Sequence, residues 1–361
     1  MCRFITGLNV IEAKNARLNG SSADVEQKKS GFDNVSYTKK IRRGYGNATR
    51  PYVSGQAQGY ALTKFWENEG FKLTKQTRVG SNQVVGEGNP AKYIDEDLRG
   101  FLYATKITLT KEEYDNLTEE EQKQFSKKGK KYEKNITKKR KAPLQISTLQ
   151  AISDTKIQTE HCTKKTDGDS ILYAKEVYSA IMASGFNVDL DKLGRYTASE
   201  DEKGFRDYTE EEIKNLGVEL QQLDEETYSL SNEERFKRLK TILEGMEFMS
   251  IRSCQVANLT DTSSKMVILG EYDWGNNIFL DVFNDKGIFD IEYFKETLRA
   301  NEKFRQSNIY IGIKSGFNDY FKDGENKDLK ERLVKELKDI EYVKISSVDE
   351  AVENFLADVK I

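Results

Sequence analysis

The sequence predicts an α+β protein with one elaborated core. Short runs of β-branched and aromatic residues, typical of strands, are mixed along the chain with segments whose apolar residues recur at helical spacing. The sequence contains no repeat of fixed period, which argues against solenoids and propellers. The 361 residues, 11% of them aromatic, are enough to bury a sizeable core.

Composition excludes several classes of protein. Charged residues make up 32% of the chain, its mean hydropathy is −0.72, and no apolar run approaches the roughly 20 residues that a membrane helix needs. The aromatic content argues against a wholly disordered chain. The three cysteines have no paired spacing, and no basic-then-apolar leader opens the sequence. We therefore expect a cytoplasmic protein with reduced thiols and no membrane partner.

The N-terminal part of the chain predicts one strand, one long loop and one helix. Residues 4–11 form an apolar, β-branched run that predicts the first strand. Residues 12–50 have no apolar stripe and are rich in Gly, Ser, Asn and Lys, a pattern typical of a functional or disordered loop. A helix is predicted over residues 52–66, with Ser54 as its N-terminal cap. Residues 79–90 form a turn-rich loop, which lacks the Gly-Lys-Ser/Thr ending of a phosphate loop.

A strand is predicted over residues 101–109, where apolar and polar residues alternate. Residues 110–141 then change character. A capping-box pattern at residues 118–121 predicts a short helix, and residues 123–141 hold ten basic side chains and one acidic one, Glu133. Because it has so few apolar residues, we interpret this segment as an arm that projects from the core. A dispensable surface insertion is the alternative.

The rest of the chain continues the mixed pattern. Residues 171–190 are predicted to form a long hairpin that turns near Ser184 and Gly185, and residues 198–230 form an acidic insertion. The other expected elements are a strand-like segment at 140–147, a helix at 233–249, two strands within 266–283 around a turn at 273–277, a helix at 291–301, a strand at 309–313, a helix at 328–338, a strand at 342–345 and a helix at 349–359.

Charge is unevenly distributed along the chain. The formal net charge is −3, from 57 basic and 60 acidic side chains. Residues 1–199 carry 34 basic and 24 acidic side chains, whereas residues 200–361 carry 23 and 36. An acidic chain that concentrates its cations in this way is suited to bind a polyanion such as nucleic acid through one face. The alternative is a solvated, lysine-rich surface.

The usual catalytic and metal-binding residue sets are missing from the sequence. Its single histidine, His161, has only Cys162 beside it, which does not make a metal site, and no nucleophile-elbow or zinc-helix motif occurs. The acidic residues at 95–97 and the pair Asp189 and Asp191 are interpreted as solvated loop charge. We therefore expect a binding protein rather than an enzyme, with no cofactor and no metal.

The segment at residues 39–54 is the strongest candidate for a binding site. It places five cations and two tyrosines before the start of a predicted helix. Basic side chains bind phosphate oxygens, the N-terminus of a helix favours an anion, and tyrosine stacks on unpaired bases. The residues are Lys39, Lys40, Arg42, Arg43, Arg50, Tyr45 and Tyr52. A cationic loop that only covers the edge of the core is the alternative.

Residues 50–57, Arg-Pro-Tyr-Val-Ser-Gly-Gln-Ala, resemble the R-P-Y-V-S-x-Q-A segment of the CRISPR RNA-binding backbone subunits of Cascade, most closely the type I-B branch called DevR. An opening strand with Gly7 and Asn9 precedes this segment, as in the family. Three further segments are similar to family motifs in the family's order: DLRGF at 97–101, KRKAPLQIS at 139–147, and 171–194, which ends in LDKLG.

This resemblance implies a modified RRM-like (ferredoxin-like) palm over residues 1–361, with an RNA-facing loop at 12–50, a thumb-like basic arm at 110–141, helical or finger insertions, and the acidic insertion at 198–230. Copies of the subunit would stack along one CRISPR RNA (crRNA) and hold it through phosphates, independently of base sequence. The guide would then pair with target DNA. The implied partners are crRNA, target DNA, neighbouring copies and other Cascade subunits.

The resemblance and the charge pattern together give the expected RNA-binding residues. These are Lys39, Lys40, Arg42, Arg43, Tyr45, Arg50, Tyr52, Ser54, Gln56, Gln58, Lys64, Lys138, Lys139, Arg140 and Lys141. Two positions depart from the family pattern. Gln58 and Gly59 stand where the family usually has Arg or Lys, with Lys64 as the expected replacement, and Arg99 stands in place of the usual Phe.

Two other functions stay open. One is a ribonuclease subunit like those of type III complexes, in which an acidic residue of the early loop, here Asp24 or Asp33, cleaves target RNA with the help of a metal ion. The other is a scaffold subunit without nucleic acid, whose basic arm contacts the acidic half of a neighbouring copy.

Overall fold

The computed structural model describes residues 2–21, 35–42, 48–79, 83–123, 125–129, 131–165, 167–168, 170–201, 204–252, 259–321 and 328–361. The chain divides into two compact units, each assembled from separate stretches of sequence. The first comprises Met1–Gly70, Leu144–Asp191 and Phe236–Ile361, and the second comprises Phe71–Pro143 and Lys192–Arg235. Among the described residues, none of the helices has both the length and the apolar character required to traverse a lipid bilayer.

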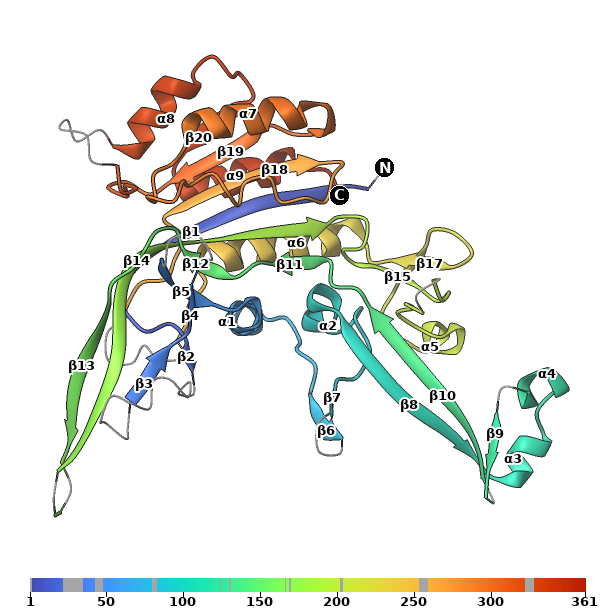
Figure 1. Ribbon diagram of the computed structural model, residues 1–361. Coiled ribbons are helices and arrows are strands. Elements are labelled where there is room, and N and C mark those ends of the chain that lie inside the picture. Colours follow the sequence, from blue (N-terminus) through green and yellow to red (C-terminus); the bar gives the residue numbers. More distant parts are fainter. Residues whose placement is uncertain are drawn as a thin grey trace. The chain divides into compact units, whose positions relative to one another are not determined.

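The first unit is built on a 12-stranded sheet (Figure 1). Its main path runs through β20 (Val343–Ser346), β19 (Ile309–Ile313), β18 (Met266–Tyr272), β1 (Phe4–Ala16), β14 (Ile171–Asp189), β12 (Leu149–Ala151), β5 (Thr49–Val53) and β4 (Lys40–Arg42). Four strands pair beside this path, namely β2 (Gly20–Ser21), β3 (Val35–Thr38), β11 (Leu144–Ile146) and β13 (Ile157–Lys164).

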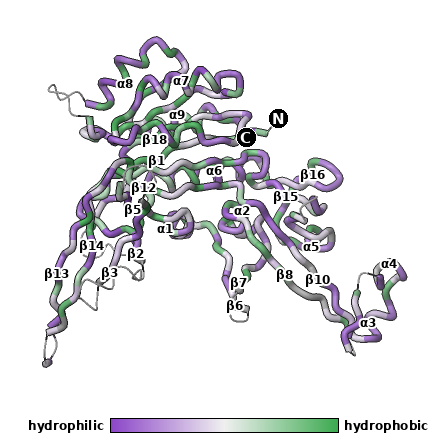
Figure 2. The backbone as a smooth tube through the Cα atoms, viewed as in Figure 1, coloured by the Kyte–Doolittle hydropathy of each residue, from purple (hydrophilic) through white to green (hydrophobic). Residues whose placement is uncertain are grey.

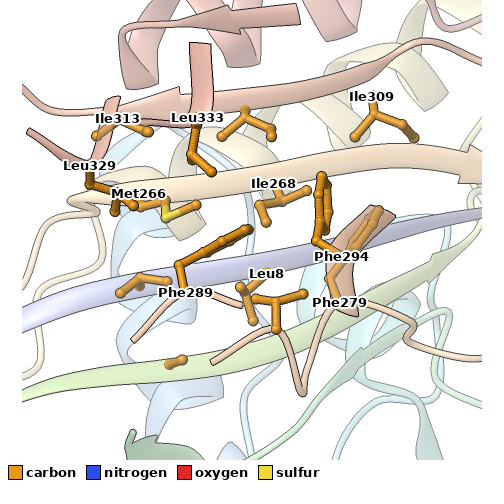
Figure 3. Close-up of a cluster of buried hydrophobic side chains, with 14 of the residues drawn as sticks. Leu8, Met266, Ile268, Phe279, Phe289, Phe294, Ile309, Ile313, Leu329 and Leu333 are labelled. Atoms are coloured by element: carbon orange, nitrogen blue, oxygen red, sulfur yellow. The ribbon is translucent and has the colours of Figure 1, made fainter. Parts of the chain in front are cut away.

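One face of this sheet carries an extended apolar core (Figure 3). Leu8 of β1, Ile268 of β18 and Ile311 of β19 are cross-strand neighbours and all three are fully buried. They pack with side chains of α7 (Ile291–Asn301) and α8 (Leu329–Leu337). Because burying one large apolar side chain stabilises the fold by about 1.5–3 kcal/mol, this cluster is a main source of the unit's stability.

Helices cover the opposite face, which the alternate residues of the same strands form. The Asn9 side chain donates to the Met246 carbonyl of α6 (Asn232–Glu247) over 3.2 Å. The Tyr310 ring packs edge-on against Phe355 of α9 (Val348–Asp358), with centroids 5.9 Å apart. α1 (Gly55–Asn68) contacts α6, where the Trp66 indole N–H donates a hydrogen bond to the Thr241 carbonyl over 3.3 Å.

The second unit contains smaller sheets and short helices. β8 (Phe101–Leu109), β10 (Lys131–Arg140) and β9 (Ser126–Lys128) form one sheet, whose largely hydrophilic β10 is apparent in Figure 2. A small core includes the buried rings of Tyr196 and Tyr208. The remaining elements are α2 (Ile94–Arg99), α3 (Lys111–Asp115), α4 (Glu119–Gln122), α5 (Glu210–Lys214), β6 (Thr77–Val79), β7 (Gln83–Val85), β15 (Arg195–Thr197), β16 (Gln221–Gln222) and β17 (Thr227–Ser229).

The α+β class is confirmed, and so are most of the predicted elements. The C-terminal order of helix, strand, helix, strand and helix matches α7, β19, α8, β20 and α9. Ser54 caps α1 as predicted, although the helix begins at Gly55 and Tyr52 belongs to β5. The RRM-like character of the core stays a prediction.

The predicted hairpin at residues 171–190 is wrong. β14 is one uninterrupted strand of 19 residues, in which Ser184 pairs with Asn9 and Gly185 with Leu8. The glycine serves a close approach rather than a turn, because a Cβ on Gly185 would lie 2.8 Å from the Asn277 amide. The hairpin of this region is formed by β13 and β14, which pair from Ile157↔Tyr178 to Lys164↔Ile171.

Two other predictions need correction. Residues 12–50 are not one continuous loop, since β1 continues to Ala16 and β2, β3 and β4 follow; residues 22–34 and 43–47 lie outside the described residues. Of the two strands predicted within 266–283, only β18 forms. The chain that follows makes turns and isolated bridges, among them Phe283 with Phe289. Its Phe279 and Val282 side chains are buried in the core, so this segment covers the sheet.

Candidate nucleic-acid interface

The N-terminus of α1 is positioned by the residue that caps it. Ser54 has an extended backbone, and its hydroxyl accepts a hydrogen bond from the Ala57 N–H over 3.4 Å. The first turn of α1 contains no acidic side chain. The positive end of the helix dipole is therefore not offset by a carboxylate of that turn, which favours an anion there. Gln56, in the same turn, is exposed.

This helix end is fixed on the segment that follows β11. The Gln58 side chain, which is fully buried, donates to the Ser147 carbonyl over 2.8 Å. A Cβ on Gly55 would lie 2.6 Å from the Ile146 carbonyl oxygen, so only glycine permits this approach. The segment at 50–57 therefore meets residues 146 and 147, which end the second motif and lie in the first unit.

β4 and β5 bring predicted cations and one tyrosine close to the same place. Lys40 forms an ion pair with Glu176 of β14, with Nζ and Oε1 2.9 Å apart. The Tyr52 N–H donates to the Lys39 carbonyl over 3.0 Å, and the Tyr52 ring is half-buried. Arg42 belongs to β4, but its side chain and all of Arg43 and Tyr45 lie outside the described residues.

Arg50 of β5 is buried, with its guanidinium bonded inside the first unit. Nη2 donates to Asp285 Oδ1 over 3.1 Å, and Nη1 donates to the Ala151 carbonyl over 3.5 Å. The sequence indicated the cation but gave no sign of Asp285, which lies 235 residues away in the chain.

A polar cavity runs beside these strands. One part of about 450 Å³ is lined by Lys40, Thr49 and Glu176, among others. It adjoins a second part of about 590 Å³, and Lys286 is among the residues that line this second part. Asp154, Thr155 and Lys156 line both parts. Sequence reasoning missed Lys156 and Lys286, because each is an isolated cation in an otherwise unremarkable stretch.

Lys64 lies on the exposed side of α1 and forms an i,i+3 ion pair with Glu67, 2.8 Å between Nζ and Oε2. The hydrogen bond to Glu67 raises the pKa of Lys64, so this side chain stays protonated in the physiological range. Lys64 is the predicted RNA-binding residue that lies beyond the first turn of α1.

The predicted cations of β10 are in the second unit, and two of them have structural roles. Lys138 is 2% exposed; it donates to the Gly88 carbonyl over 2.9 Å and pairs with Glu212 at 2.6 Å. Burial opposes ionisation of Glu212, but the contacts with Lys138 and Thr209 together outweigh it and leave the pKa of Glu212 lowered. Lys139 is half-buried, and Lys141 is exposed.

Arg140 lies at the centre of the second unit. Its guanidinium pairs with Asp97, which is fully buried, and with Asp207 at 2.9 Å, and it also donates to the carbonyls of Lys192 and Arg195. Burial alone would lower the pKa of Arg140, but the two carboxylates raise it overall. Since these contacts enclose the guanidinium, we assign Arg140 a structural role. The interpretation of the acidic residues at 95–97 as solvated loop charge is therefore wrong, because they belong to α2 and both Glu96 and Asp97 are buried. A run of basic residues does not reveal which of them has a buried partner.

The basic arm has a small aromatic cluster of its own. Tyr114 stacks on Tyr132 with centroids 3.7 Å apart, and Phe125 packs edge-on against Tyr114 at 6.3 Å. The sequence suggested that this segment buries little, whereas the cluster ties α3 to β10. Exposed cations surround it, including Lys123, Lys127, Lys128 and Lys131.

Comparison with known proteins gives one family and several structural neighbours. The family model described as "CRISPR-associated negative auto-regulator DevR/Csa2" matches residues 15–269. A chain of a "CRISPR RNA-guided surveillance complex" is 11% identical, with 98% of each chain covered and a TM-score of 0.49. A chain of a "CRISPR RNA-guided surveillance complex, pre-nicking" is 10% identical, with 98% of this chain and 99% of that chain covered and a TM-score of 0.48. No curated protein gives a significant match.

Proposed function

Since the chain belongs to the CRISPR-associated DevR/Csa2 family, we propose that it is a non-catalytic crRNA-binding subunit, present in several copies along the guide of a type I Cascade complex. It holds the guide by phosphate contacts that do not depend on base sequence, so that the bases pair with target DNA. The other subunits of the complex are its further partners.

The N-terminus of α1 is the observation that carries this proposal. The 14-residue helix has no acidic side chain in its first turn, and Ser54 and Gln56 place a hydroxyl and an amide at that end. Backbone N–H groups and the helix dipole attract a phosphate without regard to the base attached to it. This suits a subunit that must accept every guide sequence.

The neighbouring strands supply the rest of the proposed interface. Lys39 and Lys40 add positive charge, and the ring of Tyr52 offers a surface for one base or ribose. Lys156 and Lys286 add cations along the adjoining cavity, which Asp154, Glu176 and Asp285 also line. Lys138 and Arg140 are left out of the interface, because their buried contacts hold the second unit together.

Two exposed hairpins are candidates for contact with neighbouring copies. The basic arm carries exposed lysines around its aromatic cluster. The β13–β14 hairpin carries Leu172, 61% exposed, and Tyr173, 38% exposed. A two-stranded ribbon is only marginally stable alone, so an apolar surface near its tip gains stability when a partner covers it.

The proposal is tested by charge reversal in the early strands. Replacing Lys39, Lys40, Arg42 and Arg43 by Glu is expected to weaken binding of single-stranded RNA at least about 100-fold, because several phosphate contacts are lost. The matched control reverses four lysines elsewhere in the first unit: Lys330, Lys335, Lys338 and Lys344. Anisotropy titrations at several salt concentrations, with two RNAs of unrelated sequence, measure both affinity and salt slope.

Three outcomes of that titration would contradict the proposal. An affinity within about threefold of wild type with an unchanged salt slope removes the early strands from the interface. An equal loss of RNA affinity in the control variant would show that the effect comes from net charge alone. A strong preference for one RNA sequence contradicts binding through phosphates.

The non-catalytic part of the proposal has its own test. Asp24 and Asp33, the candidates for metal-dependent RNA cleavage, lie outside the described residues. We expect RNA paired to a bound guide to remain intact in the presence of Mg²⁺. Cleavage that is lost in Asp24→Ala or Asp33→Ala would establish the ribonuclease instead.

A further inference from the structure

The two members of the Arg50–Asp285 ion pair differ greatly in exposure. The Arg50 side chain is 6% exposed, whereas that of Asp285 is 81% exposed. Arg50 lies in β5, four residues before Ser54 at the start of α1. Its guanidinium therefore belongs to the segment that the proposed interface uses, and the carboxylate that binds it faces water.

Two other buried arginines hold carboxylates that are themselves buried. Arg332 donates to Asp319, which is 2% exposed, over 2.6 Å, and Arg140 pairs with Asp97, which is fully buried. Breaking such a pair leaves an uncompensated charge inside the protein and costs several kcal/mol. The Arg50–Asp285 pair differs on the carboxylate side, because the exposed Asp285 returns to water at little cost, whereas the buried guanidinium then needs another anion.

Hydrogen bonds of Asn284 hold the turn that carries Asp285. Asn284 Oδ1 accepts hydrogen bonds from the N–H groups of Lys286 and Ile288, over 3.0 and 3.1 Å. The Gly287 N–H donates to the Asn284 carbonyl over 2.8 Å, and Gly287 has a φ of +75°, which glycine adopts readily. The Asp285 side chain can therefore rotate away while the turn stays in place.

Groups around this ion pair are suited to an anion larger than a carboxylate. Asp285 lines the 590 Å³ part of the cavity, together with Lys156 and Lys286. Arg50 lines a smaller cavity of about 120 Å³ that also presents hydroxyl and amide groups. Those groups come from Ser147, Thr148 and Gln150. Phosphate oxygens accept hydrogen bonds from all of these donors, and a guanidinium binds phosphate as a two-pronged donor.

We propose that the Arg50 guanidinium binds a phosphate of the nucleic acid. The Asp285 carboxylate is exchangeable: it forms an ion pair with this guanidinium until the phosphate replaces it. The inference rests on the proposed RNA-binding function. The exchange solves a physical problem, because a buried guanidinium without an anion would destabilise the RNA-free protein. It also makes binding competitive, so that weakly bound anions do not displace Asp285.

The test compares Asp285→Asn with Asp281→Asn in the full-length chain. Asp281 is an exposed carboxylate that lines the same small cavity as Arg50, so both variants remove one negative charge close to the site. The probe is a labelled, mixed-sequence RNA of about 30 nucleotides, long enough to fill one binding site. We expect D285N to bind it about fivefold more tightly, as removal of one exposed competing ion pair predicts, and D281N to differ from wild type by less than about twofold.

A second measurement separates exchange from a general charge effect. Without RNA, D285N should melt at a lower temperature than wild type, because Arg50 has lost its partner charge, and saturating RNA should remove that difference. Combining Arg50→Gln with D285N should abolish the gain in affinity, whereas Arg50→Gln combined with D281N should bind more weakly than wild type.

Each other outcome overturns the exchange. Equal effects of D285N and D281N, an unchanged or weaker affinity of D285N, or a gain that survives removal of Arg50 each contradict it, while RNA binding by wild type leaves the proposed function standing. Failure of the wild-type chain to bind RNA at all would overturn both.

Discussion

The Gln58 side chain donates a hydrogen bond to the Ser147 carbonyl over 2.8 Å, across 89 residues of sequence. This contact fixes the start of α1 on the segment between β11 and β12. The same segment is also bonded to the central sheet, where the Ser147 hydroxyl accepts a hydrogen bond from the Gly185 N–H of β14 over 2.9 Å. The helix end that we propose as a phosphate site is therefore held rigidly against the central strands.

Gln58→Ala is expected to destabilise the protein by about 1–3 kcal/mol, because it removes a fully buried side chain and its hydrogen bond to the Ser147 carbonyl. Gln56→Ala, two residues earlier and exposed, should change stability by less than about 0.5 kcal/mol but should weaken RNA binding. Urea denaturation followed by RNA titration of each variant measures both quantities. A stable Gln58→Ala, or a Gln56→Ala that binds RNA as wild type does, contradicts these assignments.

Arg140→Gln is expected to destabilise the second unit by about 3–5 kcal/mol, because it removes the positive charge that two buried carboxylates share. Asp97→Asn should cost less, because Arg140 keeps its ion pair with Asp207. Lys141→Gln, the exposed neighbour, is the matched control and should be neutral. Limited proteolysis locates the loss of structure, and cleavage should concentrate within residues 71–143 and 192–235. A folded Arg140→Gln that has lost only RNA affinity would restore Arg140 to the interface.

Glu247 is a source of pH-dependent stability in the first unit. Burial, together with the nearby carboxylates of Asp349, Glu244 and Glu353, raises the pKa of Glu247 to about 7. The folded state therefore holds a proton that the unfolded chain releases near pH 4.5. This contribution to stability is present at low pH and is lost as the pH rises toward 7.

Glu247→Gln should consequently be more stable than wild type by about 1 kcal/mol at about pH 8, after allowance for partial exposure, and the difference should shrink toward about pH 5. Glu331→Gln, an exposed change on α8, serves as the control. Melting temperatures across this range test the sign. A difference that grows as the pH falls would show that Glu247 is stabilised as the anion.

Replacing residues 111–130 by a short Gly-Ser turn should leave both units folded and impair assembly on RNA. Leu109 and Tyr132 are cross-strand partners, so a tight turn can join β8 to β10 without disturbing Lys138 or Arg140. Sedimentation of the variant with RNA measures assembly, and Leu172→Ser with Tyr173→Ser tests the other exposed hairpin in the same assay. Loss of the fold would show the arm to be part of the core, and normal assembly would show it to be dispensable.

Local patterns predicted the C-terminal elements well, because helical and strand periodicities are distinct there and each element begins and ends at clear breaks. They failed at β14, since alternating residues fit one long strand as well as a hairpin and Gly185 suggested a turn. Local patterns also predicted Arg140 and Gln58 as RNA-binding residues, although both side chains are buried and bonded inside the protein. Whether a polar side chain faces RNA or a buried partner depends on contacts between distant segments, such as Asp97 with Arg140, which no local pattern contains.

The nucleic-acid content of the freshly purified protein tests the central claim most directly. When the chain is produced together with a guide RNA, its absorbance ratio at 260 and 280 nm and the extracted RNA should reveal a bound oligonucleotide of guide length, in a particle that contains several copies of the chain. A monomer that carries no RNA, and that leaves every RNA added to it unbound, would contradict the account.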